Sequence, residues 1–409
     1  MKTKITIIIL AMLACLACKT NGSKNKSQSD SITVNSGNTG LLEIDITKEY
    51  PAKRNSLQEI ADIEYIQLEK KENIIPDRIR YISDSIIIAI EYKHGDIITY
   101  TGDGKFISKF NKKGRSGEEY QSIGSIAYSS EDRELFITDY LLLHRIQVYS
   151  IDGLYRRTLN HPQGSWITKI YNFDSETLLA YEDPDVNVHK KNNDIFTPYL
   201  FISKKDGSIV SKVNISFKKE DRISAIKVKV IDKFRSIQAS ITQTNIIKSN
   251  GNYIIGDLSV DTIFMVKNDK SITPIVVKNR GNDPDPNLLP FLVYKNDKYS
   301  FFTVIDFNLD LDTLTNINNP KIDSRYLLYN ASDGQINEIT LYNEDYPEND
   351  IDIDGIGTLS QKGYTAYSIE AYKLVDAYKK ENLKGELKAI ASKLTDDDNR
   401  VLVKVFFKW

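Results

Sequence analysis

The stretch from Asn111 to Tyr120, "NKKGRSGEEY", places two glycines, an arginine, a serine and two glutamates between two runs that are typical of strands. Glycine-rich loops can cradle phosphates, and neighbouring carboxylates can act as acid and base. A phosphate loop, however, needs Gly-Lys-Ser/Thr at the start of a helix, where backbone N–H groups hold the phosphates. A strand follows here instead. The stretch therefore predicts a connector between two sheets, with Tyr120 packed as a wedge between them.

The same connector also supports a functional hypothesis. If the sheets surround a channel, Arg115 and Glu118 would line its mouth, and His144 and Arg145 of "TDYLLLHR" would be their neighbours. Together with Tyr120, these side chains form a predicted rim that binds a small anionic or sugar-like ligand. The sequence assigns no residue a catalytic role.

A second candidate site is the run "DIDIDG", which begins at Asp350. Asp350, Asp352 and Asp354 occupy the first, third and fifth positions of a calcium loop, and glycine follows at the sixth. The twelfth position is Gln361, where a calcium loop carries a bidentate glutamate. We interpret the run as an acidic surface turn. None of the four histidines has a zinc-site spacing, so no metal or other cofactor is predicted.

The N-terminus predicts export and lipidation. Two lysines precede the apolar run "ITIIILAMLACLA", which is too short to span a bilayer comfortably and has the length of a signal-peptide core. The pattern predicts a lipoprotein signal peptide over residues 1–17, then a lipidated Cys18 and a flexible tether over residues 18–40. Cys15 is the rival acceptor. An ordinary cleaved signal with an incidental cysteine is the other alternative.

Composition narrows the function classes. Both cysteines lie in this N-terminal stretch, so the body of the chain has no disulfide, thiolate ligand or cysteine nucleophile. The 54 basic and 56 acidic residues nearly cancel and are dispersed, which argues against nucleic acid as a partner. The predicted partners are the membrane, through the lipid anchor, and an unknown small molecule, glycan or envelope protein. No acid follows Cys18 until Asp30, which favours an outer-membrane lipoprotein of the cell envelope that faces the periplasm.

The elements that must position these residues repeat along the chain. Asp-Gly corners stand between alternating apolar runs, and Asn268-Asp269 takes the same place once. Such corners are a strong hairpin signal, because the turn needs positive φ and glycine adopts it cheaply. Their spacing of about 49–64 residues is near that of propeller blades. The five hairpins are "IITYTGDGKFISKF", "IQVYSIDGLYRRTL", "YLFISKKDGSIVSKV", "IFMVKNDKSITPIVV" and "YLLYNASDGQINEIT".

Two further strands precede each hairpin, so residues 41–409 predict an all-β, six-bladed β-propeller of four-stranded antiparallel blades. Five blades are clear, and "GIGTLSQKGYTAYSIEAYK" supplies inner strands of the sixth. We expect the N- and C-terminal strands, "IADIEYIQLEK" and "RVLVKVFFK", to close the ring in one blade. A short C-terminal helix is predicted in "LVDAYKKENLKGELKAIASKL". The alternative fold is a β-sandwich followed by a second β domain.

The chain resembles the six-bladed β-propeller lipoproteins of Gram-negative anaerobes, which are related to NHL-type propellers. The resemblance covers nearly all of the chain after the tether and rests on "IDITKEY", "IADIEYIQLEK", "DGKFISKFNKKGRSGEEY" and "LTDDDNRVLVKVFF". The family's junction usually reads Gly-Arg-Gly-Pro-Gly-Glu-Tyr. Here Ser116 replaces a small residue, the proline is missing and a second glutamate is added. The resemblance implies the fold and says little about the chemistry.

Two functions fit this picture. The first is a membrane-anchored, non-enzymatic module that binds a ligand or a protein on a wide, loop-rich face. The alternative is a metal-assisted hydrolase or lactonase, which needs Glu, Asp or Asn from several inner strands to converge on one ion. The expected inner strands "SIGSIAYSS" and "SWITKIYNF" supply mainly Ser, Tyr and apolar residues. We therefore favour the binding module and leave enzyme activity undecided.

Overall fold

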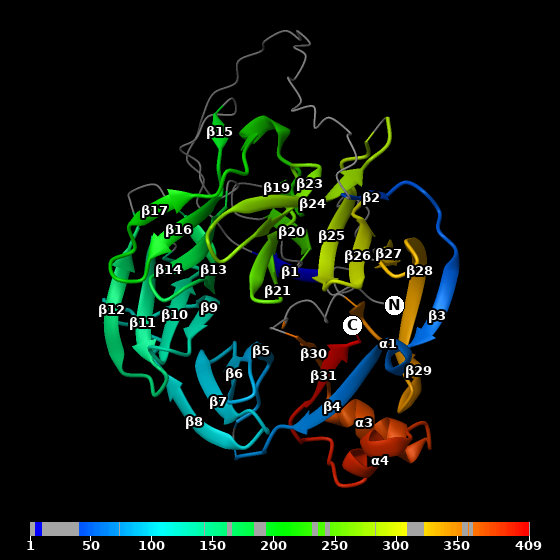
Figure 1. Cartoon of the computed structure of the whole chain (residues 1–409). Coiled ribbons are helices and arrows are strands. Elements are labelled where there is room, and N and C mark those ends of the chain that lie inside the picture. The colour runs from blue at the N-terminus through cyan, green and yellow to red at the C-terminus, as the bar shows by residue number, and fades with distance from the viewer. Residues whose placement is uncertain are drawn as a thin grey trace.

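The computed structural model shows six β-sheets arranged as blades around one axis (Figure 1). It describes residues 5–9, 41–72, 74–142, 144–161, 166–183, 194–230, 236–241, 246–282, 284–308, 323–353, 359 and 363–408. The predicted lipidation site Cys18, its rival Cys15 and most of the predicted signal peptide and tether lie outside these residues. None of the described helices is long and apolar enough to cross a membrane.

The first three blades are antiparallel and four-stranded, as predicted. In each of them the strand nearest the axis comes first in the chain, and the outermost strand comes last. The strands are β5 (Arg78–Ile82), β6 (Ile86–Glu91), β7 (Asp96–Thr101) and β8 (Phe106–Asn111) in the first blade, β9 (Ile123–Ser129), β10 (Glu134–Asp139), β11 (Arg145–Ser150) and β12 (Tyr155–Asn160) in the second, and β13 (Ile167–Asn172), β14 (Thr177–Glu182), β16 (Tyr199–Ser203) and β17 (Ile209–Lys212) in the third.

The fourth and fifth blades contain the same four antiparallel strands and an added parallel strand from the N-terminal part of the chain. The fourth consists of β21 (Ile246–Ser249), β22 (Asn252–Ile255), β23 (Thr262–Val266) and β24 (Ile272–Asn279), with β2 (Leu42–Asp45) beside β24. The fifth consists of β25 (Leu288–Lys295), β26 (Tyr299–Asp306), β27 (Asp323–Asn330) and β28 (Gln335–Asn343), with β3 (Ala52–Ser56) and β29 (Tyr346–Asp350) beside β28.

The two ends of the propeller domain meet in the sixth blade. In the part of the chain that the structure describes, this sheet is β30 (Thr365–Ile369), β31 (Val401–Phe407) and β4 (Ala61–Gln67). β31 pairs with β4 in continuous antiparallel register, from Val401 opposite Gln67 to Phe407 opposite Ala61. The predicted closure of the ring by the two chain ends is therefore confirmed, and with it the propeller fold.

The predicted hairpins are all present, each joining the third and fourth strands of a blade. The corner glycines have positive φ, as the turn requires: +89° at Gly104, +82° at Gly153, +83° at Gly207 and +70° at Gly334. In the fourth blade Lys270 adopts the same left-handed conformation, with φ +67°. The repeated corner is thus one structural position that recurs in five blades.

The predicted C-terminal helical segment is confirmed as an insertion before the last strand, but it is not one continuous helix. It forms α3 (Ala371–Lys379) and α4 (Gly385–Ala391), and Glu381 between them has φ +60°. A left-handed residue ends a helix, which explains the break that the apolar periodicity alone does not reveal. Leu374 and Leu387 are fully buried against the fifth and sixth blades.

The apolar core is divided among the blade interfaces. Six clusters of buried side chains each join two neighbouring blades around the ring, including one between the sixth blade and the first. Both faces of a blade are therefore covered, which explains why strands such as β6 and β14 are apolar almost throughout.

Short elements complete the molecule. Helix α1 (Leu57–Ile60) joins β3 to β4, with Ser56 as its N-cap, and a 3-10 turn spans Lys219–Asp221. Two small sheets pair β15 (Ile195–Phe196) with β18 (Phe217–Lys218), and β20 (Ser236–Ile241) with both β19 (Ile226–Val230) and β1 (Ile5–Ile9).

Candidate functional site

The connector between the first and second blades, residues 111–120, is built around its own backbone. Tyr120 is fully buried, its hydroxyl donates to the Gly95 carbonyl at 2.7 Å, and its ring packs edge-on against Tyr149. The Ser116 amide donates to the Glu119 carboxylate at 2.8 Å and holds the pKa of that carboxyl below its usual value. The predicted wedge between blades is present, and Glu119 serves to fix the loop.

Side chains of the second blade hold this connector from the other side. Three polar groups of β11 donate to its carbonyls: Arg145 to Glu119 at 3.1 Å, Gln147 to Gly117 at 2.7 Å and Tyr149 to Glu118 at 2.5 Å. Because β11 is the third strand of its blade, this part of the connector lies two strands away from the inner strand β9.

The predicted rim is thus only partly assembled. Arg145 does meet the connector, but its guanidinium binds a backbone carbonyl, and the Tyr120 ring offers no surface to a ligand. Arg115, Glu118 and His144 are exposed. Ligand binding by these residues stays a prediction.

A different set of charged side chains lies on the inner strands. Arg78 and Arg80 belong to β5 in the first blade, and Lys169 belongs to β13 in the third. We call these three residues the axial cation cluster. Arg80 and Lys169 are both half-buried, and the positive charge of Arg80 is one cause of the lowered pKa of Lys169, after burial. The two cations therefore lie close together although they belong to different blades.

Arg80 is the least compensated member of this cluster. No ion pair or hydrogen bond joins it to another described residue, and its Nε is buried without a partner. Burial lowers the pKa of its guanidinium, and Arg78 lowers it further, whereas Tyr140 and Tyr92 act in the opposite direction. Burying a cation without a counter-ion is costly, so the position is poised to receive an anion.

The Asp183 carboxylate acts on one member of this cluster and on a second cation. Asp183 raises the pKa of Lys169, and Arg222 contacts Asp183 at 3.3 Å in a largely buried ion pair. Arg222 also donates to the hydroxyl of the buried Tyr181 at 3.5 Å. Asp183 is therefore shared between Lys169 and Arg222.

Tyrosine rings from several blades lie beside the inner strands. Tyr81 packs on Tyr128 with ring centroids 5.2 Å apart, and Tyr171 packs on Tyr253 at 5.9 Å. Burial raises the pKa of Tyr253 and Tyr364, and Tyr81 contributes to both shifts. Tyr81 directly follows Arg80 on β5, so the first of these ring pairs lies beside the axial cation cluster.

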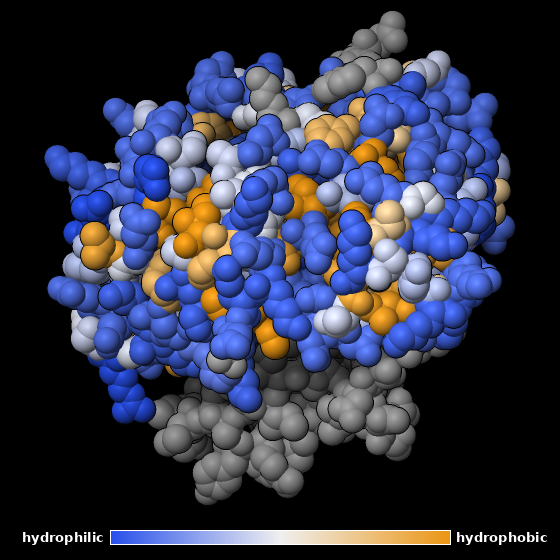
Figure 2. Space-filling model, turned by 90° about the horizontal axis from the view of Figure 1, so that it is seen from below, coloured by the Kyte–Doolittle hydropathy of each residue, from blue (hydrophilic) through white to orange (hydrophobic). Residues whose placement is uncertain are grey.

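Other candidate positions show no comparable arrangement. Asp350 pairs with Arg54 at 3.3 Å and Asp352 accepts from the Tyr326 hydroxyl at 3.3 Å, while Asp354 and Gln361 lie outside the described residues. Among described residues, no group of three His, Cys, Asp or Glu side chains could hold a metal ion. On the outer face in Figure 2, apolar side chains are interspersed among charged ones.

Arg80 is not among the site residues predicted from the sequence, although the sequence carries a signal for it. "DRIRYIS" places Arg78 and Arg80 two residues apart in a strand that is otherwise apolar. In a regular strand this spacing puts both side chains on one side. In β5 the pairing with β6 shifts register between Ile79 and Tyr81, so this alternation is interrupted at Arg80. Lys169 could not be linked to them in advance, because its proximity depends on the curvature of the whole ring.

Among solved structures, the chain is similar to a protein from Bacteroides fragilis NCTC 9343 described as a "putative exported protein". The two are 12% identical, the TM-score is 0.59, and the match covers 88% of this chain and 99% of the other. A member of the DUF4221 family from Bacteroides vulgatus ATCC 8482 matches with 9% identity and a TM-score of 0.46, over 85% of this chain and 97% of that one. No curated protein matches.

The first of these similarities shows the fold alone, in agreement with the six blades of the structure. The resemblance to a β-propeller family noted from the sequence is confirmed at that level. Residues 41–406, which comprise the propeller from β2 to β31, match the model described as "Domain of unknown function (DUF4934)", and the chain therefore belongs to the DUF4934 family.

Proposed function

We propose that this protein is a cell-envelope binding module that takes up an anionic ligand at the axial cation cluster. The observation that carries the proposal is Arg80, a half-buried arginine on an inner strand with no ion pair among the described residues. Arg78 and Lys169 add positive charge, and the guanidinium fork suits a carboxylate, sulfate or phosphate oxygen pair. The half-buried rings of Tyr81 and Tyr171 offer contact surface for the rest of the ligand.

The test uses thermal unfolding in the presence of sulfate, phosphate and glucuronate, with glucose as the uncharged reference. A ligand at a hundred times its Kd stabilises the folded state by about 2.7 kcal/mol, which raises Tm measurably. We expect anions to raise the Tm of the wild type and to have little effect on Arg80→Gln or Lys169→Gln. Arg156→Gln is the matched control, because Arg156 is exposed on β12.

Arg80→Gln should also separate binding from folding. Because the arginine is enclosed without a counter-ion, its removal should leave the ligand-free protein as stable as the wild type, or more stable. An equal anion-induced Tm rise in Arg80→Gln, Arg156→Gln and wild type would contradict the proposed site.

The envelope location is a second part of the proposal. It is supported by the apolar N-terminal run that ends at Cys18 and by the polar stretch that follows. We expect Cys18→Ser to release the protein from the membrane fraction and to abolish labelling by a palmitate analogue. Cys15→Ser should remain in the membrane fraction and should still be labelled. Resistance to protease added to intact cells would support the periplasmic orientation, and rapid digestion would contradict it.

A further inference from the structure

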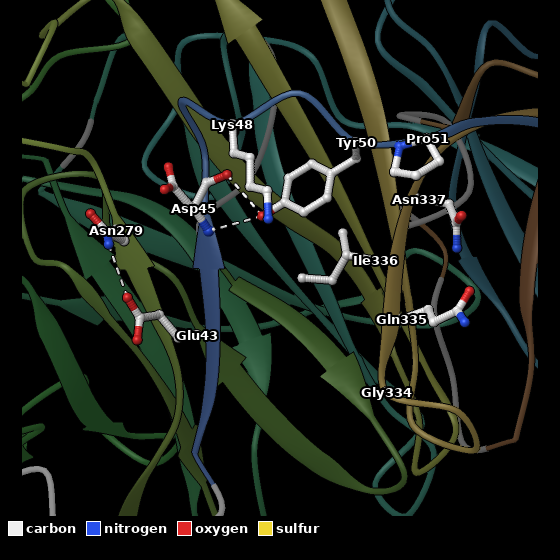
Figure 3. Close-up of a pocket in the computed structure, with 10 residues that line it drawn as sticks. All are labelled: Glu43, Asp45, Lys48, Tyr50, Pro51, Asn279, Gly334, Gln335, Ile336 and Asn337. Atoms are coloured by element: carbon white, nitrogen blue, oxygen red, sulfur yellow. Dashed lines mark hydrogen bonds between the residues drawn. The ribbon is translucent and has the colours of Figure 1, made fainter.

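The segment of residues 41–56, which we call the strap, forms one wall of a cleft between the fourth and fifth blades. The cleft has a volume of about 700 Å³, which is within the range of small-molecule sites. Figure 3 shows its walls: the strap on one side and the corner between β27 and β28 on the other. Its lining residues are Glu43, Asp45, Lys48, Tyr50, Pro51, Asn279, Gly334, Gln335, Ile336 and Asn337.

Tyr50 is fixed in this cleft as a preformed aromatic wall. Its hydroxyl donates to the Asp45 carbonyl at 3.0 Å and accepts from the Asp45 amide at 3.2 Å. The half-buried ring also packs against the apolar cluster between the two blades, near Ile336 (Figure 3). Because the ring is held at both ends, a ligand that stacks on it loses little protein side-chain entropy.

The polar groups of the cleft favour hydroxyl groups over anions. Glu43 accepts from the Asn279 amide at 2.9 Å, and Asp45 accepts from the backbone amide of Thr47 at 2.9 Å. Each carboxylate has further acceptor capacity. On the opposite wall, Ile336 faces Tyr50, whereas the side chains of Gln335 and Asn337 point to the other side of β28 (Figure 3). The two carboxylates outnumber the single ammonium of Lys48, so the cleft repels a negatively charged ligand.

We propose that this cleft binds a neutral pyranose ring, with one C–H face on Tyr50 and its hydroxyls on the carboxylates of Glu43 and Asp45. A sugar ring combines an apolar face with several hydroxyl groups that donate and accept, which matches an aromatic wall flanked by carboxylate acceptors. This site is separate from the axial cation cluster in position and in charge.

Binding here would also hold the strap in place. The strap contributes Glu43, Asp45, Lys48, Tyr50 and Pro51 to the cleft, whereas the other lining residues belong to the two blades or to the corner. A ligand that contacts both sides should therefore slow the local opening of the strap. Slower amide hydrogen exchange of residues 42–50 on addition of sugar is the expected signature.

The experiment is saturation-transfer NMR on the lipid-free protein, with methyl glucopyranoside, galactopyranoside and mannopyranoside as probes and glucuronate as the charged reference. We expect transfer to at least one neutral pyranoside, at least a fivefold loss in Tyr50→Ala, and a severalfold loss in Glu43→Gln. Tyr372→Ala is the matched control, since Tyr372 is 53% exposed on α3.

Glu43→Gln guards against loss of the strap itself, because Glu43 is exposed and its replacement costs little stability. Three results would overturn the proposal: no transfer to any of the three pyranosides, transfer that is unchanged in both Tyr50→Ala and Glu43→Gln, or sugar-induced protection that appears away from residues 42–50. Failure of anion binding at Arg80 would leave all of these readouts unaffected.

Discussion

At the scale of single residues, the polar side chains around the connector form hydrogen bonds to backbone carbonyls, whereas Arg80 forms no such bond to a described residue. Tyr120, Arg145 and Tyr149 each bind a carbonyl of the connector or of its neighbouring blade. Arg80 has no such partner among the described residues. Tyr120, Arg145 and Tyr149 therefore stabilise the fold, whereas burial of the Arg80 guanidinium costs free energy that a bound anion would offset.

The Tyr120 hydroxyl provides a direct test of the connector. Tyr120→Phe keeps the ring and removes the hydrogen bond to the buried Gly95 carbonyl. Because an acceptor is left without its partner, we expect the free energy of unfolding to fall by about 1–2 kcal/mol, measured by urea denaturation. Tyr372→Phe, at an exposed position, should change stability by less than about 0.5 kcal/mol. Equal effects of the two substitutions would refute the structural role of Tyr120.

His161 makes stability depend on pH. Burial, with a smaller contribution from His144, lowers the pKa of this imidazole to about 4, whereas an unfolded chain has a value near 6.5. Between these values the unfolded state binds more protons, so stability is complete above about pH 6.5 and falls as the pH drops toward 4. We expect wild type to lose about 2–3 kcal/mol relative to His161→Gln between pH 7 and pH 4. Parallel stability curves for the two proteins over this range would contradict the assignment.

At the scale of elements, the strap is the part that the sequence did not reveal. Its strands β2 and β3 extend two blades in parallel, and the Arg325 guanidinium binds the carbonyls of Ile46 and Lys48 between them. Ile44 and Ile46 are almost completely buried in the cluster between the fourth and fifth blades. The strap therefore joins these blades along their outer edges.

Truncating one strap isoleucine should measure this contribution. Ile44→Ala removes a fully buried side chain, and we expect unfolding to become easier by about 2–4 kcal/mol in urea. Leu154→Ala is the control, because Leu154 is 62% exposed and its truncation should cost little. If Ile44→Ala were as stable as the control, the strap would be a passive extension rather than part of the core.

The Asp-Gly corners contribute differently in different blades. A Cβ at Gly153 would lie 2.5 Å from the Phe110 ring on the outer strand of the first blade, whereas one at Gly334 would meet nothing within 4 Å. Gly334→Ala should therefore cost only the strain of its positive φ, about 1 kcal/mol. Gly153→Ala should cost at least about 1 kcal/mol more, because it also clashes with the neighbouring blade. If calorimetry showed an equal fall in Tm for Gly153→Ala and Gly334→Ala, the corner at Gly153 would not pack against the Phe110 ring.

The elements also show how far the sequence could be read. The hairpins were predictable because a tight turn depends on local residues. Gly104 and Gly153 supply the positive φ that the turn needs. The strap was not predictable, because short parallel pairing to an outer strand has no local pattern of its own. The same limit applies to the site. The contact of Arg145 with the connector was predictable, because the connector and the loop before Arg145 are expected on the same face of the propeller. The proximity of Arg80 to Lys169 was not predictable, because it depends on how the blades pack around the axis.

At the scale of the whole molecule, the packing of successive blades makes the axial site. β31 and β4 come from opposite ends of the domain, yet they pair along their full length and bring the sixth blade against the first. The second blade packs against the first on one side and the third on the other, and so places the inner strands that carry Arg80 and Lys169 on either side of it. Architecture and proposed function are therefore tested together at this site.

The most direct test is anomalous X-ray diffraction from a crystal soaked in selenate, an anion whose position the selenium signal reveals. We predict an anomalous peak within about 4 Å of the Arg80 guanidinium, the range of a direct ion pair, and no peak there in Arg80→Gln crystals soaked in the same way. A wild-type crystal without selenium at Arg80, or an identical peak in the Arg80→Gln crystal, would contradict the account.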